Sequence, residues 1–200
     1  MGADTEARFR ALFQQHHAAV RRYALHRAIR GADADDLVNE VFTVAWRRLG
    51  DVPTDDALPW LLAVAHNVRR NQARSARRYD ALHLVLPRPD DVPPPGEPDV
   101  DADRLRQAFD HLSPDDQEVL RLLAWDDLTP RQIAVVLGCP DGTARARLHR
   151  ARRRLAERLA NFEGDGDDED DAGNAGNGGS AGRSSGRFVA EITRPEEGQP

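Results

Sequence analysis

The residues best suited to chemistry lie in an arginine-rich segment in the C-terminal half of the chain. Seven arginines and a single acid, Glu157, occur between Arg145 and Arg158. At about 100° per residue in a helix, the apolar residues of this segment fall on one face and the polar residues on the other. The apolar face holds Ala144, Leu148, Ala151, Leu155 and Leu159, and the opposite face holds Thr143, Arg147, Arg150 and Arg153. Because the planar guanidinium grips guanine or phosphate through two hydrogen bonds, this face suits DNA binding.

A short helix and a turn come immediately before this segment. Thr129-Pro130-Arg131-Gln132 has the spacing of a capping box with proline at the first helical position, and Gly138 ends the helix before the turn Cys139-Pro140-Asp141. Residues 128–155 therefore predict a helix-turn-helix whose second helix enters the major groove. A solvated basic helix in an ordinary helical hairpin is the alternative that spacing alone leaves open.

A second polar face is predicted on a helix that starts near Asp55 to Pro59 and runs to about Tyr79. Its buried side is formed by Leu61, Val64, Ala65 and Val68, and its opposite side by Asn67, Arg70, Arg74 and Arg78, with Asn71 at the margin. Asparagine can hydrogen-bond base edges and arginine can neutralise phosphates, so this helix also fits nucleic acid. Trp60, at its head, is predicted to be a core residue rather than a base-stacking platform.

An acidic cluster occupies the start of the preceding helix and includes Asp33, Asp35, Asp36, Asn39 and Glu40. It could bind magnesium for phosphodiester chemistry, stabilise its own helix N-terminus, or dock a basic partner. No second carboxylate group completes a two-metal site, which makes the enzyme the least favoured of the three. The scattered histidines and the one cysteine lack metal-ligand spacing, so we expect no catalytic residue, no metal and no cofactor.

The elements that must position these residues are all predicted to be helical. A first helix carries the stripe Phe9, Leu12, Phe13, His16, Val20 and Tyr23; a second opens after Gly31 with Asp33 as its N-cap and closes at Gly50. Helical periodicity returns at Leu105, Ser113 caps the next helix, and the last helix runs from Gly142 to about Asn161. Between them, residues 87–103 contain six prolines and six acids, which predicts a linker.

Length and composition restrict the class of protein to which these helices can belong. The chain has 200 residues, of which 40% are hydrophobic and 31% charged, and no stretch reaches the roughly 18 apolar residues of a membrane span. We therefore expect a soluble chain without membrane insertion. The single cysteine, Cys139, cannot close an intramolecular disulfide, and the polar start MGADTEARFR lacks a secretion-signal pattern, so a reducing cytoplasm is expected. The net charge of −6 conceals segregation, because residues 105–160 carry ten arginines against eight acids and residues 161–200 carry three against ten. Such asymmetry suggests basic surfaces for a polyanion joined to acidic connectors.

Three segments in order resemble the extracytoplasmic-function sigma factors of the bacterial sigma-70 family. They read DADDLVNEVFTVAWRRL, then PWLLAVAHNVRRNQARSARR, then LSPDDQEVLRLLAWDDLTPRQIAVVLGCPDGTARARLHRARRRL. The resemblance implies an all-α protein with two small helical domains. Region 2 would span residues 5–80 and region 4 residues 105–161, with an acidic proline-rich linker at 81–104 and a disordered tail at 162–200.

The resemblance also assigns roles to individual residues. Docking to core RNA polymerase falls on Asp35, Asp36, Leu37, Glu40, Val41 and Phe42. Reading of the −10 promoter element falls on Asn67, Arg70, Asn71, Arg74 and Arg78, with the two asparagines holding an exposed base of the melted strand. Reading of the −35 element falls on Thr143, Arg145, Ala146, Arg147, His149, Arg150 and Arg153.

The implied activity is recognition without covalent catalysis: the chain would direct core RNA polymerase to promoter DNA. The acidic linker would lie in the polymerase's RNA channel as a polyanion mimic, and an anti-sigma factor is a further partner that the family allows. Ala144 and Ala146 depart from the usual family residues, and His66 stands where arginine is common, so base preference is not transferred. The alternatives are a stand-alone helix-turn-helix regulator and, less favoured, a metal-dependent nuclease.

Overall fold

The computed structural model describes residues 3–27, 31–80 and 100–164, and these form seven α-helices and one 3-10 turn with no strand among them. The all-α prediction is thereby confirmed for this part of the chain. The helices group into two compact units. The first unit holds Met1–Pro93 and Trp125–Ala144, and the second holds Pro94–Ala124 and Arg145–Pro200.

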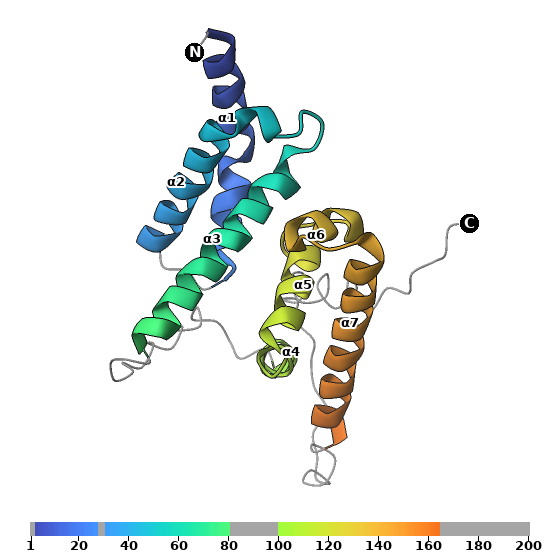
Figure 1. The fold of residues 1–200 in the computed structure, drawn as a ribbon. Helices are drawn as coiled ribbons and strands as arrows, with labels where there is room; N and C mark the ends of the chain where they lie inside the picture. Colours follow the sequence, from blue (N-terminus) through green and yellow to red (C-terminus); the bar gives the residue numbers. More distant parts are fainter. Residues whose placement is uncertain (1–2, 28–30, 81–99, 165–200) are drawn as a thin grey trace, which may run out of the picture. The chain divides into compact units, whose positions relative to one another are not determined.

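In the first unit, α1 (Ala3–Leu25), α2 (Gly31–Arg47) and α3 (Ala57–Asp80) pack against one another as a three-helix bundle (Figure 1). Each helix contributes one apolar stripe to a shared core, as the sequence period predicts. Fully buried members include Val20, Tyr23, Leu37, Val41, Leu61 and Leu62. The short helix α6 (Pro130–Leu137) belongs to the same unit and packs on α3.

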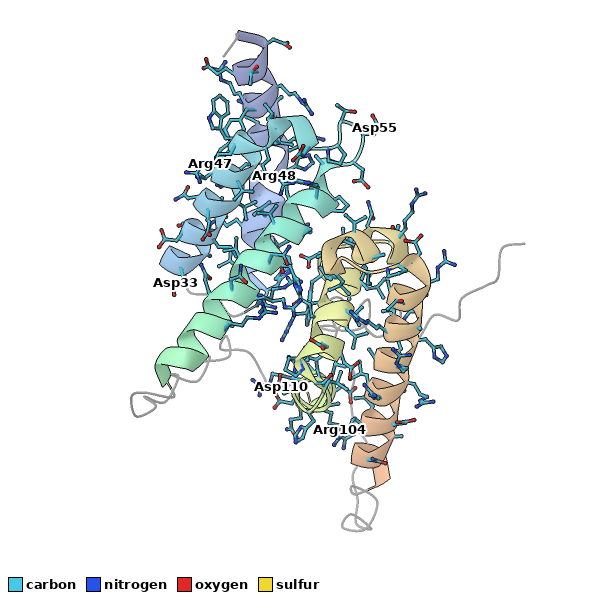
Figure 2. All side chains as sticks on the ribbon, viewed as in Figure 1. Asp33, Arg47, Arg48, Asp55, Arg104 and Asp110 are labelled. Carbon is cyan, nitrogen blue, oxygen red and sulfur yellow. The ribbon has the colours of Figure 1, made fainter. Side chains whose placement is uncertain are left out.

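Helix α2 differs at both ends from its sequence prediction. It begins at Gly31, so Asp33 lies in the first turn rather than at the N-cap, and it ends at Arg47 before the 3-10 turn Leu49–Asp51. Figure 2 shows Asp33 and Arg47 at opposite ends of the helix. Both charges still complement the helix dipole, with the acid at the positive end and the base at the negative end.

The second unit contains α4 (Val100–Asp110), α5 (Pro114–Ala124) and most of α7 (Asp141–Gly164). Helix α4 begins at Val100, five residues before the predicted start, because Asp101 and Asp103 continue the helix as first-turn acids. Ser113 caps α5 as predicted, since its hydroxyl accepts a 3.2 Å hydrogen bond from the Asp116 backbone N–H. The predicted linker core at 81–99 lies outside the described residues.

The turn between α6 and α7 follows the predicted chemistry closely. Thr129 and Gln132 form a reciprocal capping box at the start of α6. Gly138 adopts a left-handed conformation (φ 61°, ψ 40°), and Cys139 N–H donates back to the Ala134 carbonyl at 3.0 Å. Glycine suits this position because a Cβ disfavours positive φ. The chain then enters α7, which runs to Gly164, three residues beyond the predicted end.

Candidate nucleic-acid interface

The polar face predicted for the last helix is exposed on α7. Ala144, Leu148, Ala151 and Leu155 are buried, as the period requires. Six of the seven residues proposed to read DNA are exposed and the seventh, Thr143, is half-buried; the exposed ones are Arg145, Ala146, Arg147, His149, Arg150 and Arg153. A helix with this division can rest on its apolar stripe while presenting guanidinium groups to a polyanion.

Two ion pairs order the second half of α7. Arg153 pairs with Glu157 one turn later at 3.2 Å, and both side chains are more than half exposed. Arg154 reaches α5, where its Nη1 lies 2.6 Å from Asp116 Oδ2. Ser113 Oγ also donates to that carboxylate at 2.7 Å. The Asp116 carboxylate is 11% exposed, so this pair fixes the side of α7 that faces α5.

On α3 the structure separates the two predicted faces. Leu61, Ala65 and Val68 are buried and Val64 is half-buried. The residues predicted to meet the −10 element are exposed where described, namely Asn67, Arg70, Asn71 and Arg74; the side chain of Arg78 lies outside the described set. Trp60 is half-buried, and the Arg48 guanidinium carbon lies 5.9 Å from its ring centroid.

The residues of α2 predicted to dock a partner divide into exposed polar residues and buried apolar residues. Asp35, Asp36, Asn39 and Glu40 are exposed, whereas Leu37, Val41 and Phe42 are at most 3% exposed. Asp35 pairs with Arg21 of α1 at 2.8 Å, and Gln72 of α3 donates to Glu40 at 3.5 Å. The carboxylates can therefore meet a partner directly, while the three apolar residues hold them in place from the core.

Two contacts of the first unit had no signal in the sequence. Arg27 Nη2 lies 2.9 Å from Asp126 Oδ2, and the two side chains are 0% and 3% exposed. Arg27 also covers the Tyr23 ring at 3.5 Å and donates to the Tyr23 carbonyl. Nearby in the same unit, Gln132 Nε2 donates to Asp56 at 2.9 Å. The partners of the ion pair are 99 residues apart, and periodicity carries no information on such pairings.

Nothing in the described residues resembles a metal centre, since no group of three or more His, Cys, Asp or Glu side chains gathers there. His16 lines a cavity of about 510 Å³ bounded by α1 and the 49–58 segment. Partial burial lowers the pKa of His16 below 6.5, and the Asp56 carboxylate opposes this by raising it. No described helix is long and apolar enough to cross a bilayer.

These features define a class of helical protein with two polar or basic helix faces and a helix-turn-helix. Two protein families match this chain: "Sigma-70 region 2" over residues 12–79 and "Sigma-70, region 4" over residues 102–155. The region 4 match spans α4 to α7 and thus includes parts of both compact units.

Individual relatives agree with the family match. The ECF RNA polymerase sigma factor SigL of Mycobacterium tuberculosis is 34% identical over 155 residues, which cover 74% of this chain and 87% of SigL. The RNA polymerase sigma factor CarQ of Myxococcus xanthus is 30% identical over 161 residues, covering 78% and 91%. Among solved structures, the sigma factor RpoE of Bartonella quintana, crystallised with the anti-sigma factor NepR, is 25% identical with a TM-score of 0.61, covering 76% and 96%.

The chain belongs to the ECF sigma factors of the sigma-70 family. Proteins of this family are regulatory, DNA-binding subunits that act with RNA polymerase in transcription initiation, and they are not enzymes. The recognition made from the sequence motifs is confirmed.

Proposed function

We propose that this chain directs RNA polymerase in the cytoplasm to promoters whose −35 element is read by α7 and whose melted −10 strand is held by α3. The observation that carries the proposal is the presence of two exposed nucleic-acid-type faces on separate helices of one chain. Thr143 to Arg153 supply one and Asn67 to Arg74 supply the other. A stand-alone regulator would need only the first.

The two faces differ in ways that suit their proposed targets. On α7, arginine forks can read guanine edges and grip phosphates of intact duplex in the major groove. On α3, Asn67 and Asn71 offer amide groups that can hydrogen-bond an unstacked base, with Arg70 and Arg74 beside them for the backbone. Capturing the flipped base must offset a few kcal/mol of unstacking.

The exposed acids of α2 are the proposed polymerase dock. Asp35, Asp36 and Glu40 present carboxylates to solvent, and Leu37, Val41 and Phe42 contribute by supporting the helix from below. An acidic face of this kind suits a basic partner surface. An anti-sigma factor is a further proposed partner, because the similar Bartonella sigma factor is bound to one.

Reconstitution with bacterial core RNA polymerase tests the proposal. We expect the chain to bind core polymerase and to yield transcripts whose starts, when sequenced, share −35 and −10 motifs. Asp36→Arg should weaken core binding without loss of helical content. The matched control is Asp110→Arg, which makes the same charge reversal at an exposed acid of α4 and should bind core normally.

Three results would each reject a part of the proposal. Duplex binding without any transcription on core polymerase would favour a stand-alone regulator. Magnesium-dependent DNA cleavage lost in Asp36→Ala would favour a nuclease. Normal core affinity in a folded Asp36→Arg protein would remove the docking role from the α2 acids.

A further inference from the structure

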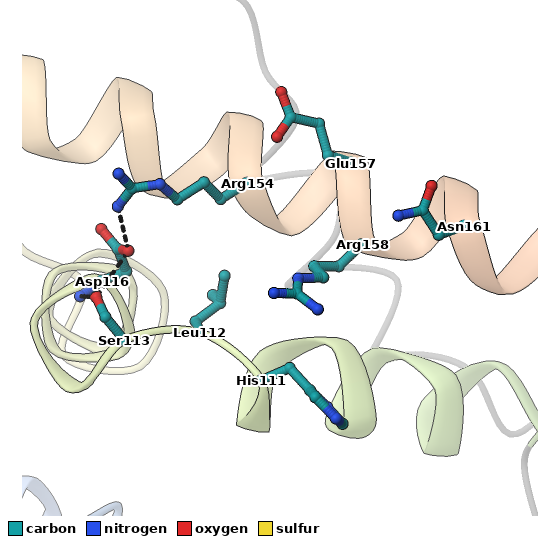
Figure 3. A pocket seen from close by; sticks show the side chains of 8 residues that line it. All are labelled: His111, Leu112, Ser113, Asp116, Arg154, Glu157, Arg158 and Asn161. Atoms are coloured by element: carbon teal, nitrogen blue, oxygen red, sulfur yellow. Dashed lines mark hydrogen bonds and ion pairs between the residues drawn. The ribbon is translucent and has the colours of Figure 1, made fainter.

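A cavity of about 610 Å³ lies in the second unit, between α7 and the turn that joins α4 to α5. Its polar lining comes mainly from α7, with His111, Leu112 and Ser113 on the other side (Figure 3). In Figure 3, Arg158 extends from α7 across the cavity toward the His111–Leu112 turn, whereas Glu157 points away from it. The cavity is therefore an open, polar site rather than a part of the core.

The charged side chains that line this cavity balance formally, with Arg154 and Arg158 against Asp116 and Glu157, but both acids already have partners. Asp116 is engaged by both Arg154 and Ser113, and Glu157 is engaged by Arg153. Arg158 lines the same cavity but has no ion-pair partner within 4 Å among the described residues. Its neighbours Arg153 and Arg154 each have one. A guanidinium in this position is suited to a carboxylate that approaches from outside the described structure.

A dense source of carboxylates follows α7 directly. Residues 165–171 read DGDDEDD and carry six acids with no base, against a net charge of −6 for the whole chain. Arg158 and Arg154 lie about 9 and 15 Å back along the helix from Gly164, at 1.5 Å per residue. Seven extended residues span up to about 24 Å, so the acidic run can reach both arginines and extends about as far as Arg150.

We propose that the acidic run 165–171 folds back into this cavity, where its carboxylates pair with Arg158 and the outer nitrogens of Arg154. Tethering favours the contact, because direct covalent attachment to α7 holds the run at an effective concentration of about millimolar. The occupant is thus a segment of the same chain that follows α7 directly and whose charge is opposite to that of Arg158.

Occupancy of this site should weaken DNA binding by α7. The bound acids would neutralise part of the helix's positive field and compete for the side of the helix near Arg150 and Arg154, while Arg145 lies beyond their reach. The tail would then act as an intramolecular competitor for duplex DNA. This consequence depends on the proposed DNA-binding role of α7, whereas the docking of the tail does not.

Two full-length variants with the same change in charge separate local docking from net charge. D167N/D168N/E169Q neutralises three acids of the run, and E191Q/E196Q/E197Q neutralises three acids near the end of the tail. We expect the first to bind a promoter duplex about five-fold more tightly than wild type at low salt and the second less than about two-fold. Added salt should abolish the difference, because the contacts are exposed and screened.

A second readout does not require DNA. NMR resonances of the Arg154 and Arg158 guanidinium N–H groups should shift between wild type and D167N/D168N/E169Q, and should not shift in E191Q/E196Q/E197Q. Arg158→Ala should remove the DNA-affinity difference between wild type and the run variant, whereas the matched control Arg22→Ala, on the exposed surface of α1, should preserve it.

The outcomes are distinguishable from failure of the proposed function. If the arginine resonances shift while no variant binds DNA, the tail docks but α7 is not a DNA reader. If the resonances do not move, or both triple variants change affinity equally, the docking proposal is wrong. Equal binding of inorganic phosphate at Arg158 in wild type and the run variant would show a small-anion site and would likewise overturn it.

Discussion

Helices α3 and α7 share one design but differ in the chemistry of the exposed face and in the way each is supported. The α3 face combines the amides of two asparagines with two described arginines. The α7 face carries four arginines, one histidine, one threonine and one alanine. The unit holding α3 contains a fully buried ion pair, Arg27–Asp126, while the unit holding most of α7 contains the half-exposed pair Arg154–Asp116. The comparison teaches that similar amphipathic helices can present different polar chemistry to solvent while relying on unequal electrostatic supports.

The largest expected effect on stability comes from removing Arg27, the buried ion-pair partner of Asp126. Arg27→Met should lower the free energy of unfolding by about 3–5 kcal/mol, because the buried Asp126 carboxylate loses its guanidinium partner. Hydrogen exchange of the α1–α3 amides measures this loss for the first unit alone. Arg154→Met is the matched control; hydrogen exchange of the α5 and α7 amides should show a cost of about 1 kcal/mol or less, since the Arg154 side chain is 50% exposed. If both variants lose the same unfolding free energy, the buried Arg27–Asp126 pair contributes no more to stability than the Arg154–Asp116 pair.

The second effect tests the chemistry of the α7 face. Arg150→Ala should weaken binding to the −35 duplex by about 1–3 kcal/mol and relax preference at particular base pairs, if Arg150 contacts a guanine edge. Arg153→Ala, on the same exposed side, should weaken all sequences alike and reduce the salt slope by about one, as expected for a phosphate contact. Competition binding over a library of −35 variants measures both. Sequence-independent loss in both variants would make α7 a purely electrostatic contact.

The third effect tests whether α3 acts on single-stranded DNA. Asn67→Ala should cost about 1 kcal/mol through one lost hydrogen bond, expressed as reduced selectivity at one −10 base with −35 binding intact. Permanganate footprinting of holoenzyme on duplex and pre-melted promoters measures it. Gln14→Ala, which removes an exposed amide on α1, is the matched control and should leave the footprint unchanged. If selectivity on the pre-melted promoter is unaffected by Asn67→Ala, the base-holding role belongs elsewhere.

Sequence reasoning predicted the local features because their causes are local. The capping box at Thr129, the Ser113 cap and the left-handed Gly138 all depend on residues within five positions of one another. Exposure of the α3 and α7 faces followed from the helical period in the same way. The residue roles assigned by family resemblance remain predictions.

The features missed by sequence reasoning depend on distant or fine-grained contacts. The Arg27–Asp126 pair and the Gln132–Asp56 hydrogen bond join residues 99 and 76 positions apart. By contrast, the helical period places Leu37, Val41 and Phe42 on the apolar stripe of the second helix, and their burial confirms it, although the resemblance grouped them with the exposed acids as one dock. Helix ends at Gly31 and Val100 differed because polar first turns can continue a helix without an apolar signal.

The smallest expected effect is a pH dependence that belongs to the first unit. Burial lowers the pKa of His16 below its unfolded value of 6.5, with Asp56 opposing the change. The folded state therefore binds fewer protons than the unfolded state near this pH, so stability present above pH 6.5 is lost as the pH falls toward the folded pKa.

His16→Gln removes this linkage, and the advantage of wild type over the variant in unfolding free energy should shrink on acidification. Asp56→Asn should enlarge the acid loss in wild-type His16, because it removes the charge that raises the pKa. Denaturation of the three proteins between pH 8 and pH 5 measures both trends, and a wild-type advantage that grows in acid would show that attraction to Asp56 outweighs burial.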